Sequence, residues 1–166
     1  MFEAPILDPV RFTTLAEVVE GRVPVRDLER LQSALHSTGG EIRYRVAGLR
    51  TPEGHPALTL HVEGALDLTC QRCLGGVPFR LAVDSQVVMF KDEEALPDLE
   101  EEVEGVDAIV QPEKLSIAEL VEDEVLLSLP LVPSHPDGAC RTDGETEAAL
   151  AKEPPFAALQ KLKQST

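Results

Sequence analysis

The chain has 166 residues and carries 30 acidic against 15 basic side chains, which gives a formal net charge of −15. A hydrophobic fraction of 43% can form a packed core, whereas 13 prolines and 11 glycines predict many turns and short helices. No apolar run approaches the roughly 18 residues that span a bilayer, and Glu3 and Asp8 stand where a signal peptide needs basic residues. We therefore expect a globular cytoplasmic protein with no membrane segment. The excess of acidic residues also argues against a protein that simply wraps around nucleic acid, because phosphate binding normally needs a basic surface.

The acidic charge is concentrated in the second half of the chain. Residues 1–91 contain 10 basic and 11 acidic side chains, whereas residues 92–166 contain 5 and 19. We expect the second half to attract basic proteins and to repel phosphate. Residues 92–104 are the densest acidic run and are predicted to form a mobile loop, either merely solvated or used to bind a partner. One α+β domain is expected over about residues 1–138, followed by a polar tail over residues 139–166.

Residues 24–36 are the first predicted element. Val25, Leu28, Leu31 and Leu35 recur at helical spacing, which predicts an amphipathic helix that starts at a proline and is closed by Gly39 and Gly40.

Strands follow this segment. Apolar and polar residues alternate over 42–46 and 58–62 on either side of the turn 51–54, so a hairpin is predicted. The alternation continues to Cys70, pauses over residues 70–76 and resumes over 77–89, which places Cys70 and Cys73 at a turn between two strands. Residues 103–110 could add a further short strand. An antiparallel sheet of about four to six strands with two main helices packed on it is expected.

Residues 115–129 give the strongest helix pattern. Ser116 and Glu119 fit a capping box, and Pro130 ends the helix. The predicted apolar arc contains Ile117, Leu120, Val121, Val125 and Leu127, with Glu119, Glu122 and Asp123 outside it.

Glu124 points into this arc, and burying an unpaired charge there would be costly. A cation such as Arg72 or the surroundings of a metal site could compensate. Alternatively, the helix lies at the surface and Glu124 reaches solvent. In the tail, residues 155–163 predict a short amphipathic helix that packs back on the domain or binds a partner.

The cysteines and one histidine form a candidate metal set. Cys70 and Cys73 in a Cys-x-x-Cys spacing fit either a zinc knuckle or a redox dithiol. A redox pair usually precedes a helix, whereas this pair leads into a strand, which favours the knuckle. His135 and Cys140 supply two further ligands, so we expect a structural zinc site made by Cys70, Cys73, His135 and Cys140. The alternative is three unliganded cysteines and a loop histidine.

Familiar catalytic motifs are absent from the sequence. It contains no Gly-rich phosphate loop after a strand, no Gly-x-Ser-x-Gly and no His-Glu-x-x-His. Glu122, Asp123 and Glu124 are adjacent on a helix and diverge by about 100° each, so they do not converge on one divalent ion. We therefore expect a protein without enzymatic activity.

Three segments resemble the large ribosomal RNA subunit accumulation protein family, called YceD. They are Leu-Thr-Cys-Gln-Arg-Cys at 68–73, followed by Pro78 and Phe79; Leu-Val-Glu-Asp-Glu-Val-Leu-Leu-Ser-Leu-Pro-Leu-Val-Pro at 120–133, with His135 and Cys140; and Pro-Phe-Ala-Ala-Leu-Gln-Lys-Leu-Lys at 155–163. The resemblance implies a bacterial-type cytoplasmic protein needed for accumulation or processing of 23S ribosomal RNA. It implies no catalytic residues.

Two functions are compatible with these patterns. In the first, an assembly factor uses Glu122, Asp123 and Glu124 to bind a basic ribosomal protein or a large-subunit precursor, while Arg43, Arg45, Arg72 and Arg80 lie near RNA. With only six aromatic residues, its binding to naked RNA should be weak. Each arginine taken singly also fits an ordinary solvent-facing position. In the second, Cys70 and Cys73 cycle in a dithiol redox or metal-responsive protein.

Overall fold

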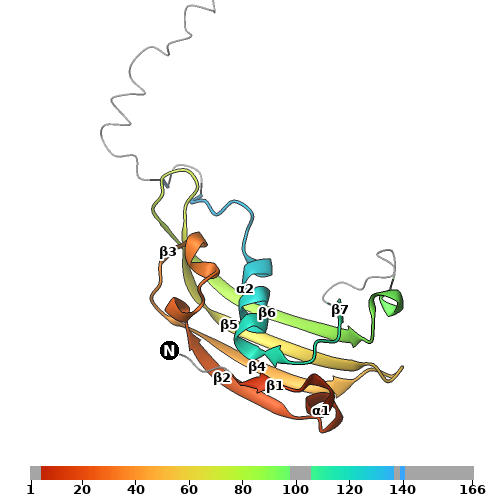
Figure 1. The fold of residues 1–166 in the computed structure, drawn as a ribbon. Helices are drawn as coiled ribbons and strands as arrows, with labels where there is room; N and C mark the ends of the chain where they lie inside the picture. The colour runs from red at the N-terminus through yellow and green to blue at the C-terminus, as the bar shows by residue number, and fades with distance from the viewer. Residues whose placement is uncertain (1–4, 98–105, 137–138, 141–166) are drawn as a thin grey trace, which may run out of the picture.

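The computed structural model describes residues 5–97, 106–136 and 139–140. Within them, a six-stranded sheet has the order β2-β4-β5-β6-β7, with β3 pairing on β5 (Figure 1). The strands are β2 (Val18–Pro24), β3 (Leu35–Ser37), β4 (Glu41–Arg50), β5 (Pro56–Thr69), β6 (Gly76–Phe90) and β7 (Val106–Val110). Every pairing is antiparallel except β6 with β7, which is parallel. The α+β class with a mostly antiparallel sheet is confirmed.

One face of the sheet forms the core. In β4 the side chains of Ile42, Tyr44 and Val46 are buried while those between them are exposed, as the alternation predicted. The long helix α2 (Ile117–Ser128) lies across this face, and the short helix α1 (Pro9–Thr14) packs against β4 and β5 (Figure 1). A separate two-stranded pair, β1 (Ile6–Leu7) with β8 (Leu115–Ser116), leads into α2. The apolar face of the sheet therefore positions α2.

Helix α2 begins where the sequence predicted, but the side that it buries differs from the predicted apolar arc. Ser116 caps it by accepting a hydrogen bond from the backbone N–H of Glu119 at 3.4 Å. The prediction that Glu124 faces the packed side is confirmed, because its side chain is only 6% exposed. Two other assignments were wrong: Glu122 is 7% exposed, and Leu127 is 76% exposed. The buried side of α2 is shifted toward Glu122 because the chain around Leu31 packs there and supplies hydrogen-bond donors.

The helix predicted over residues 24–36 is not formed. Strand β2 runs to Pro24, and two single 3₁₀ turns, η1 (Val25–Asp27) and η2 (Leu31–Ala34), precede β3. The backbone of Leu28 is extended between them. The N–H of Val25 donates to Gly40 at 3.1 Å and that of Leu31 donates to Glu122 at 3.2 Å, so tertiary contacts replace helical hydrogen bonds. The apolar spacing did predict the buried side chains, since Val25, Leu28 and Leu31 are buried and Leu35 is partly buried against the core.

The remaining predictions are only partly described. Of the strand predicted over 103–110, residues 106–110 form β7, and residues 103–105 lie outside the described part. Of the acidic loop, residues 92–97 include a single 3₁₀ turn, η3 (Glu93–Ala95), capped by the Asp92 carboxylate, whereas residues 98–104 lie outside the described part. The tail helix predicted over 155–163 also lies outside it. Among the helices of the described ranges, none has both the length and the apolar composition of a membrane-spanning segment.

Candidate functional site

The turn between β5 and β6 presents the first two cysteines. The N–H of Cys70 donates to Gly75 at 2.8 Å, and the N–H of Leu74 donates back to Cys70 at 2.9 Å. The N–H of Arg72 lies 3.4 Å from Cys70 Sγ, a contact that stabilises a thiolate. Leu74 adopts a left-handed backbone with φ of 59° to close this turn. The turn therefore points both sulfurs to one side.

His135 follows α2 and faces these sulfurs. Its Nε2 lies 2.9 Å from the carbonyl of Gly76, which can only accept a hydrogen bond, so Nε2 carries the proton. The lone pair of Nδ1 then points to Cys73 Sγ at 3.4 Å and Cys140 Sγ at 3.8 Å. A metal-binding histidine usually has its second nitrogen fixed in this way.

The four side chains lie close enough together to bind one metal ion. The ligand atoms of Cys70, Cys73, His135 and Cys140 all lie within 4.8 Å of one another. Zinc–sulfur bonds of about 2.3 Å and zinc–nitrogen bonds of about 2.0 Å place tetrahedral sulfurs about 3.8 Å apart and a sulfur and nitrogen about 3.5 Å apart. The observed Cys70–Cys140 separation is 3.8 Å and the Cys73–His135 separation is 3.4 Å. The predicted set is thus confirmed as a cluster that could hold a metal.

Hydrogen bonds to backbone carbonyls hold the two halves of this cluster together. The N–H of Gln71 donates to Pro133 at 2.9 Å, and Arg72 Nη2 donates to the carbonyls of His135 at 2.5 Å and Pro136 at 3.3 Å. Arg72 therefore joins the turn between β5 and β6 to the segment that carries His135, and the groups that act on Glu124 are Ser85, Asp107 and Asp123.

The thiols of the cluster differ in their electrostatics. Burial raises the pKa of Cys70, but hydrogen bonds from the N–H groups of Arg72, Cys73 and His135, together with the contact of the His135 side chain, outweigh it and lower the pKa to about 5. Burial and the neighbouring Cys73 and Cys70 sulfurs raise the pKa of Cys140. A thiolate is the form that ligates a metal, so one ligand is prepared for binding.

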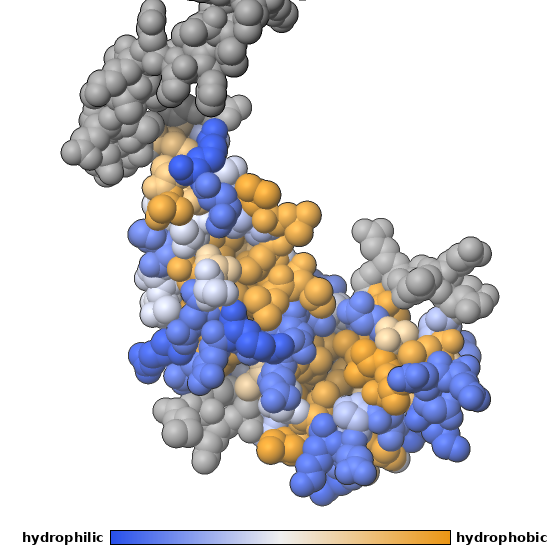
Figure 2. Space-filling view, turned by 45° about the horizontal axis from the view of Figure 1, so that its top comes forward, coloured by the Kyte–Doolittle hydropathy of each residue, from blue (hydrophilic) through white to orange (hydrophobic). Residues whose placement is uncertain are grey.

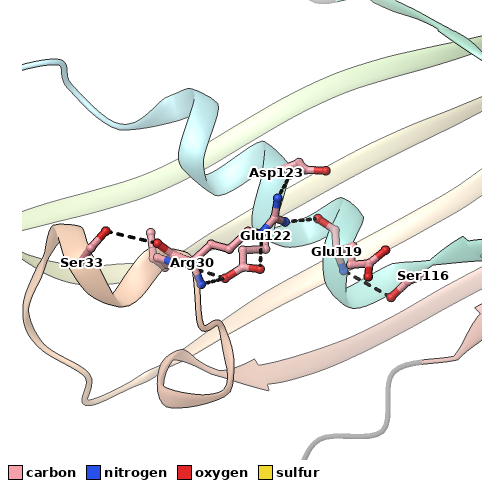
Figure 3. A network of polar contacts seen from close by, with 7 residues as sticks. Arg30, Ser33, Ser116, Glu119, Glu122 and Asp123 are labelled. Atoms are coloured by element: carbon pink, nitrogen blue, oxygen red, sulfur yellow. Dashed lines mark hydrogen bonds and ion pairs between the residues drawn. The ribbon is translucent and has the colours of Figure 1, made fainter.

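The acidic residues of α2 lie in different environments. Glu122 Oε1 accepts from the N–H of Arg30 at 2.8 Å and of Leu31 at 3.2 Å, and Oε2 accepts from Arg30 Nε at 2.9 Å (Figure 3). Asp123 accepts from Arg30 Nη1 at 2.6 Å, and its side chain is otherwise exposed. The hydrogen bonds that Arg30 donates to Glu122 and, to a smaller extent, to Asp123 raise the pKa of Arg30. Sequence reasoning missed Arg30, because nothing in the local pattern marks it as the partner of a residue 92 positions later.

Glu124 is the buried acid without such a partner. Burial raises its pKa, Ser85 lowers it, and Asp107 and Asp123 raise it further. The Ser85 hydroxyl, itself buried, has no hydrogen bond of normal geometry among the described residues. None of the groups that act on Glu124 is a cation.

The four predicted RNA-facing arginines do not form one patch. Arg43 forms an ion pair with Glu63 at 3.1 Å, and Arg45 forms one with Glu20, both on the exposed face of the sheet. Arg43 and Arg80 line a shared surface hollow there, whereas Arg72 lies apart at the metal cluster. Contact of Arg43 or Arg45 with phosphate would compete with these neighbouring carboxylates.

A mostly antiparallel sheet crossed by an acidic helix, with a Cys₃His cluster joining a strand turn to the exit of that helix, defines a small α+β protein with a candidate metal staple. Residues 58–163 match the family described as Large ribosomal RNA subunit accumulation protein YceD. A protein of that name from Haemophilus influenzae is 26% identical over 170 aligned residues, which cover 95% of this chain and 94% of the relative. The chain belongs to the YceD family. No solved structure matches it.

Proposed function

We propose that this chain is a noncatalytic factor for accumulation of the large ribosomal RNA, and that it acts in biogenesis of the large subunit by binding basic ribosomal components. The observation that carries this proposal is the match to the YceD family over residues 58–163, with a relative named for large ribosomal RNA accumulation that aligns along 95% of the chain.

The distribution of charge supports a protein partner over RNA. Asp107 of β7 and Glu119, Asp123 and Glu124 of α2 line one groove. Arg43 and Arg45 are occupied by neighbouring carboxylates. Such a surface attracts Lys-rich and Arg-rich proteins and repels phosphate. Binding to naked ribosomal RNA should therefore be weak and should vanish at physiological salt, whereas a precursor particle or a basic ribosomal protein should bind more strongly.

We also propose that Cys70, Cys73, His135 and Cys140 hold a structural zinc ion. Four protein ligands leave no open position for water or substrate, which fits a structural role. The ion would tie the segment after α2 to the turn between β5 and β6, and so fix where α2 ends relative to the sheet. Arg72 and the Gly76 carbonyl would orient His135 for this purpose.

A dithiol redox or metal-responsive role for Cys70 and Cys73 is the second candidate. The low pKa of Cys70, at about 5, favours it, because a reactive thiol must be ionised. Substituting Cys70 and Cys73 by Ser separates the two. If the variant loses bound zinc and melts at a lower temperature, the structural zinc site is supported. If it keeps its fold and loses only thiol reactivity, redox cycling is supported.

The main proposal is tested in cells depleted of this protein. We expect the ratio of 23S to 16S ribosomal RNA to fall, large-subunit precursors to accumulate, and the wild-type gene to restore both. A normal ratio after full depletion would contradict the proposal. The purified full chain should leave precursor 23S RNA intact, and its turnover of that RNA would refute the noncatalytic part.

A further inference from the structure

A groove of about 700 Å³ between α2 and β7 has no role in the metal cluster. Its walls include Leu120 and Leu127 from α2 and Ile109 from β7, and Val87 of β6 lies in its lining. Leu127 is 76% exposed, although it is a leucine next to a packed helix face. Figure 2 shows apolar side chains exposed together on the face of the molecule that carries α2. An apolar surface of this kind usually marks a binding site.

The polar residues of the groove are mainly acidic. Asp107, Glu119, Asp123 and Glu124 line it, against the single cation Lys114 among its described lining residues. Glu124 lines the groove with 6% of its side chain exposed, and the groups acting on it are Ser85 and two further carboxylates. A buried carboxylate among like charges is costly unless a cation joins it.

A metal ion does not fit these carboxylates. In the described part of the chain, the group of metal-ligating atoms close enough to share an ion is the Cys₃His cluster, and the groove carboxylates do not form a second one. A nucleic acid is opposed by the same negative charge. A second copy of this chain, with net charge −15, is opposed as well. The complementary occupant is a cationic side chain on an apolar segment.

We propose that the groove between α2 and β7 binds an amphipathic basic segment of a large-subunit ribosomal protein, with a Lys or Arg side chain reaching Glu124. Its apolar side chains pack on Leu127 and Ile109, and a second cation lies near Asp107, since Asp123 is already paired with Arg30. This inference rests on the proposed function and names the surface and partner chemistry for it. The incoming cation forms a charge-assisted hydrogen bond and relieves the unpaired burial of Glu124.

The test uses overlapping 15-residue peptides that cover the large-subunit ribosomal proteins of the source organism as probes. Full-length protein is screened against them, and the best binders are measured by fluorescence polarisation. Glu124→Gln keeps the shape of the side chain and removes its charge, Leu127→Ser removes apolar surface, and Glu29→Gln changes the net charge equally on an exposed residue outside the groove. Thermal unfolding verifies that each variant is folded.

We expect peptides that combine basic and apolar residues to bind, and Glu124→Gln and Leu127→Ser each to weaken binding by about tenfold or more. Glu29→Gln should change it by less than about twofold. Methyl resonances of Ile109 and Leu127 should shift on binding. Wild-type affinity in both groove variants, or no peptide binding at all, overturns the groove assignment. The depletion assay then decides the proposed function separately, since rescue by Glu124→Gln would leave that function standing without the groove.

Discussion

Glu122 accepts hydrogen bonds from both the backbone N–H and the guanidinium of Arg30, at 2.8 and 2.9 Å, across 92 residues of sequence. The same carboxylate also accepts from the N–H of Leu31 at 3.2 Å. Through these contacts one side chain of α2 fixes the turn between η1 and η2 against the helix (Figure 3). An acidic residue that the helical pattern placed on the solvent side is therefore part of the tertiary structure.

Glu122→Ala should lower the free energy of unfolding by about 2–4 kcal/mol, because it leaves the N–H groups of Arg30 and Leu31 without their acceptor. Glu122→Gln keeps one acceptor oxygen and should cost less. Asp123→Asn serves as the control, since it removes an exposed ion pair with the same arginine and should cost under about 1 kcal/mol. Urea unfolding measures all three, and equal losses for Glu122→Ala and Asp123→Asn would contradict the assignment.

Removal of zinc should destabilise the protein. Protein purified without added metal should contain about one equivalent of zinc. With free zinc about a thousandfold above its dissociation constant, binding adds about 4 kcal/mol, which corresponds to a melting temperature roughly 10 °C higher. Calorimetry before and after chelation measures the difference.

His135→Ala should reproduce the effect of chelation and make the melting temperature insensitive to it. His36→Ala is the matched control, because His36 is exposed and lies outside the cluster. Absence of bound zinc in the wild-type protein, with freely titratable thiols, would refute the structural zinc site.

The stability of the protein should depend on pH through Glu124. Burial raises the pKa of this carboxyl above its usual 4.5, so the fold favours the protonated form. The stability that Glu124 contributes is complete below the unfolded-state pKa and is lost as the pH rises through the folded-state pKa. Glu124→Gln should therefore melt higher than wild type at neutral pH, and the difference should vanish below about pH 4. Glu29→Gln controls for net charge, and an equal gain in that variant would assign the effect to general repulsion.

Gly48→Ala should destabilise the packing of α1 on β4. A Cβ at position 48 would lie 2.6 Å from the backbone oxygen of Phe12 and 2.9 Å from its Cδ1, so the backbone must move. We expect a loss of about 1–3 kcal/mol in urea unfolding. Gly39→Ala is the matched control, because the nearest atom to its new Cβ is Ser37 Oγ at 3.5 Å, an ordinary contact. A loss in Gly39→Ala as large as in Gly48→Ala would show that a general effect of replacing glycine, not the contact with Phe12, decides the result.

Local features of the sequence determined several parts of this protein. Alternating residues in β4 and β5 predicted their pairing and inward faces, and Ser116 predicted the start of α2. The spacing of Cys70, Cys73, His135 and Cys140 predicted which side chains meet. Alternation, capping and turn chemistry are readable because they act between residues close together in the chain. The two halves of the metal set lie 62 residues apart, and they were joined by the four ligands that a structural zinc ion needs.

Other features were decided only by the tertiary structure. The segment 24–36 has helical spacing, yet donors that a helix would use internally bind Gly40 and Glu122 instead. The parallel pairing of β7, the proton on His135 Nε2 and the isolation of Glu124 among carboxylates likewise depend on residues distant in sequence. Hydrophobic periodicity predicts which side chains face the core. Which residue each of them contacts follows from how the whole chain packs, and the candidate functions of this protein depend on those contacts.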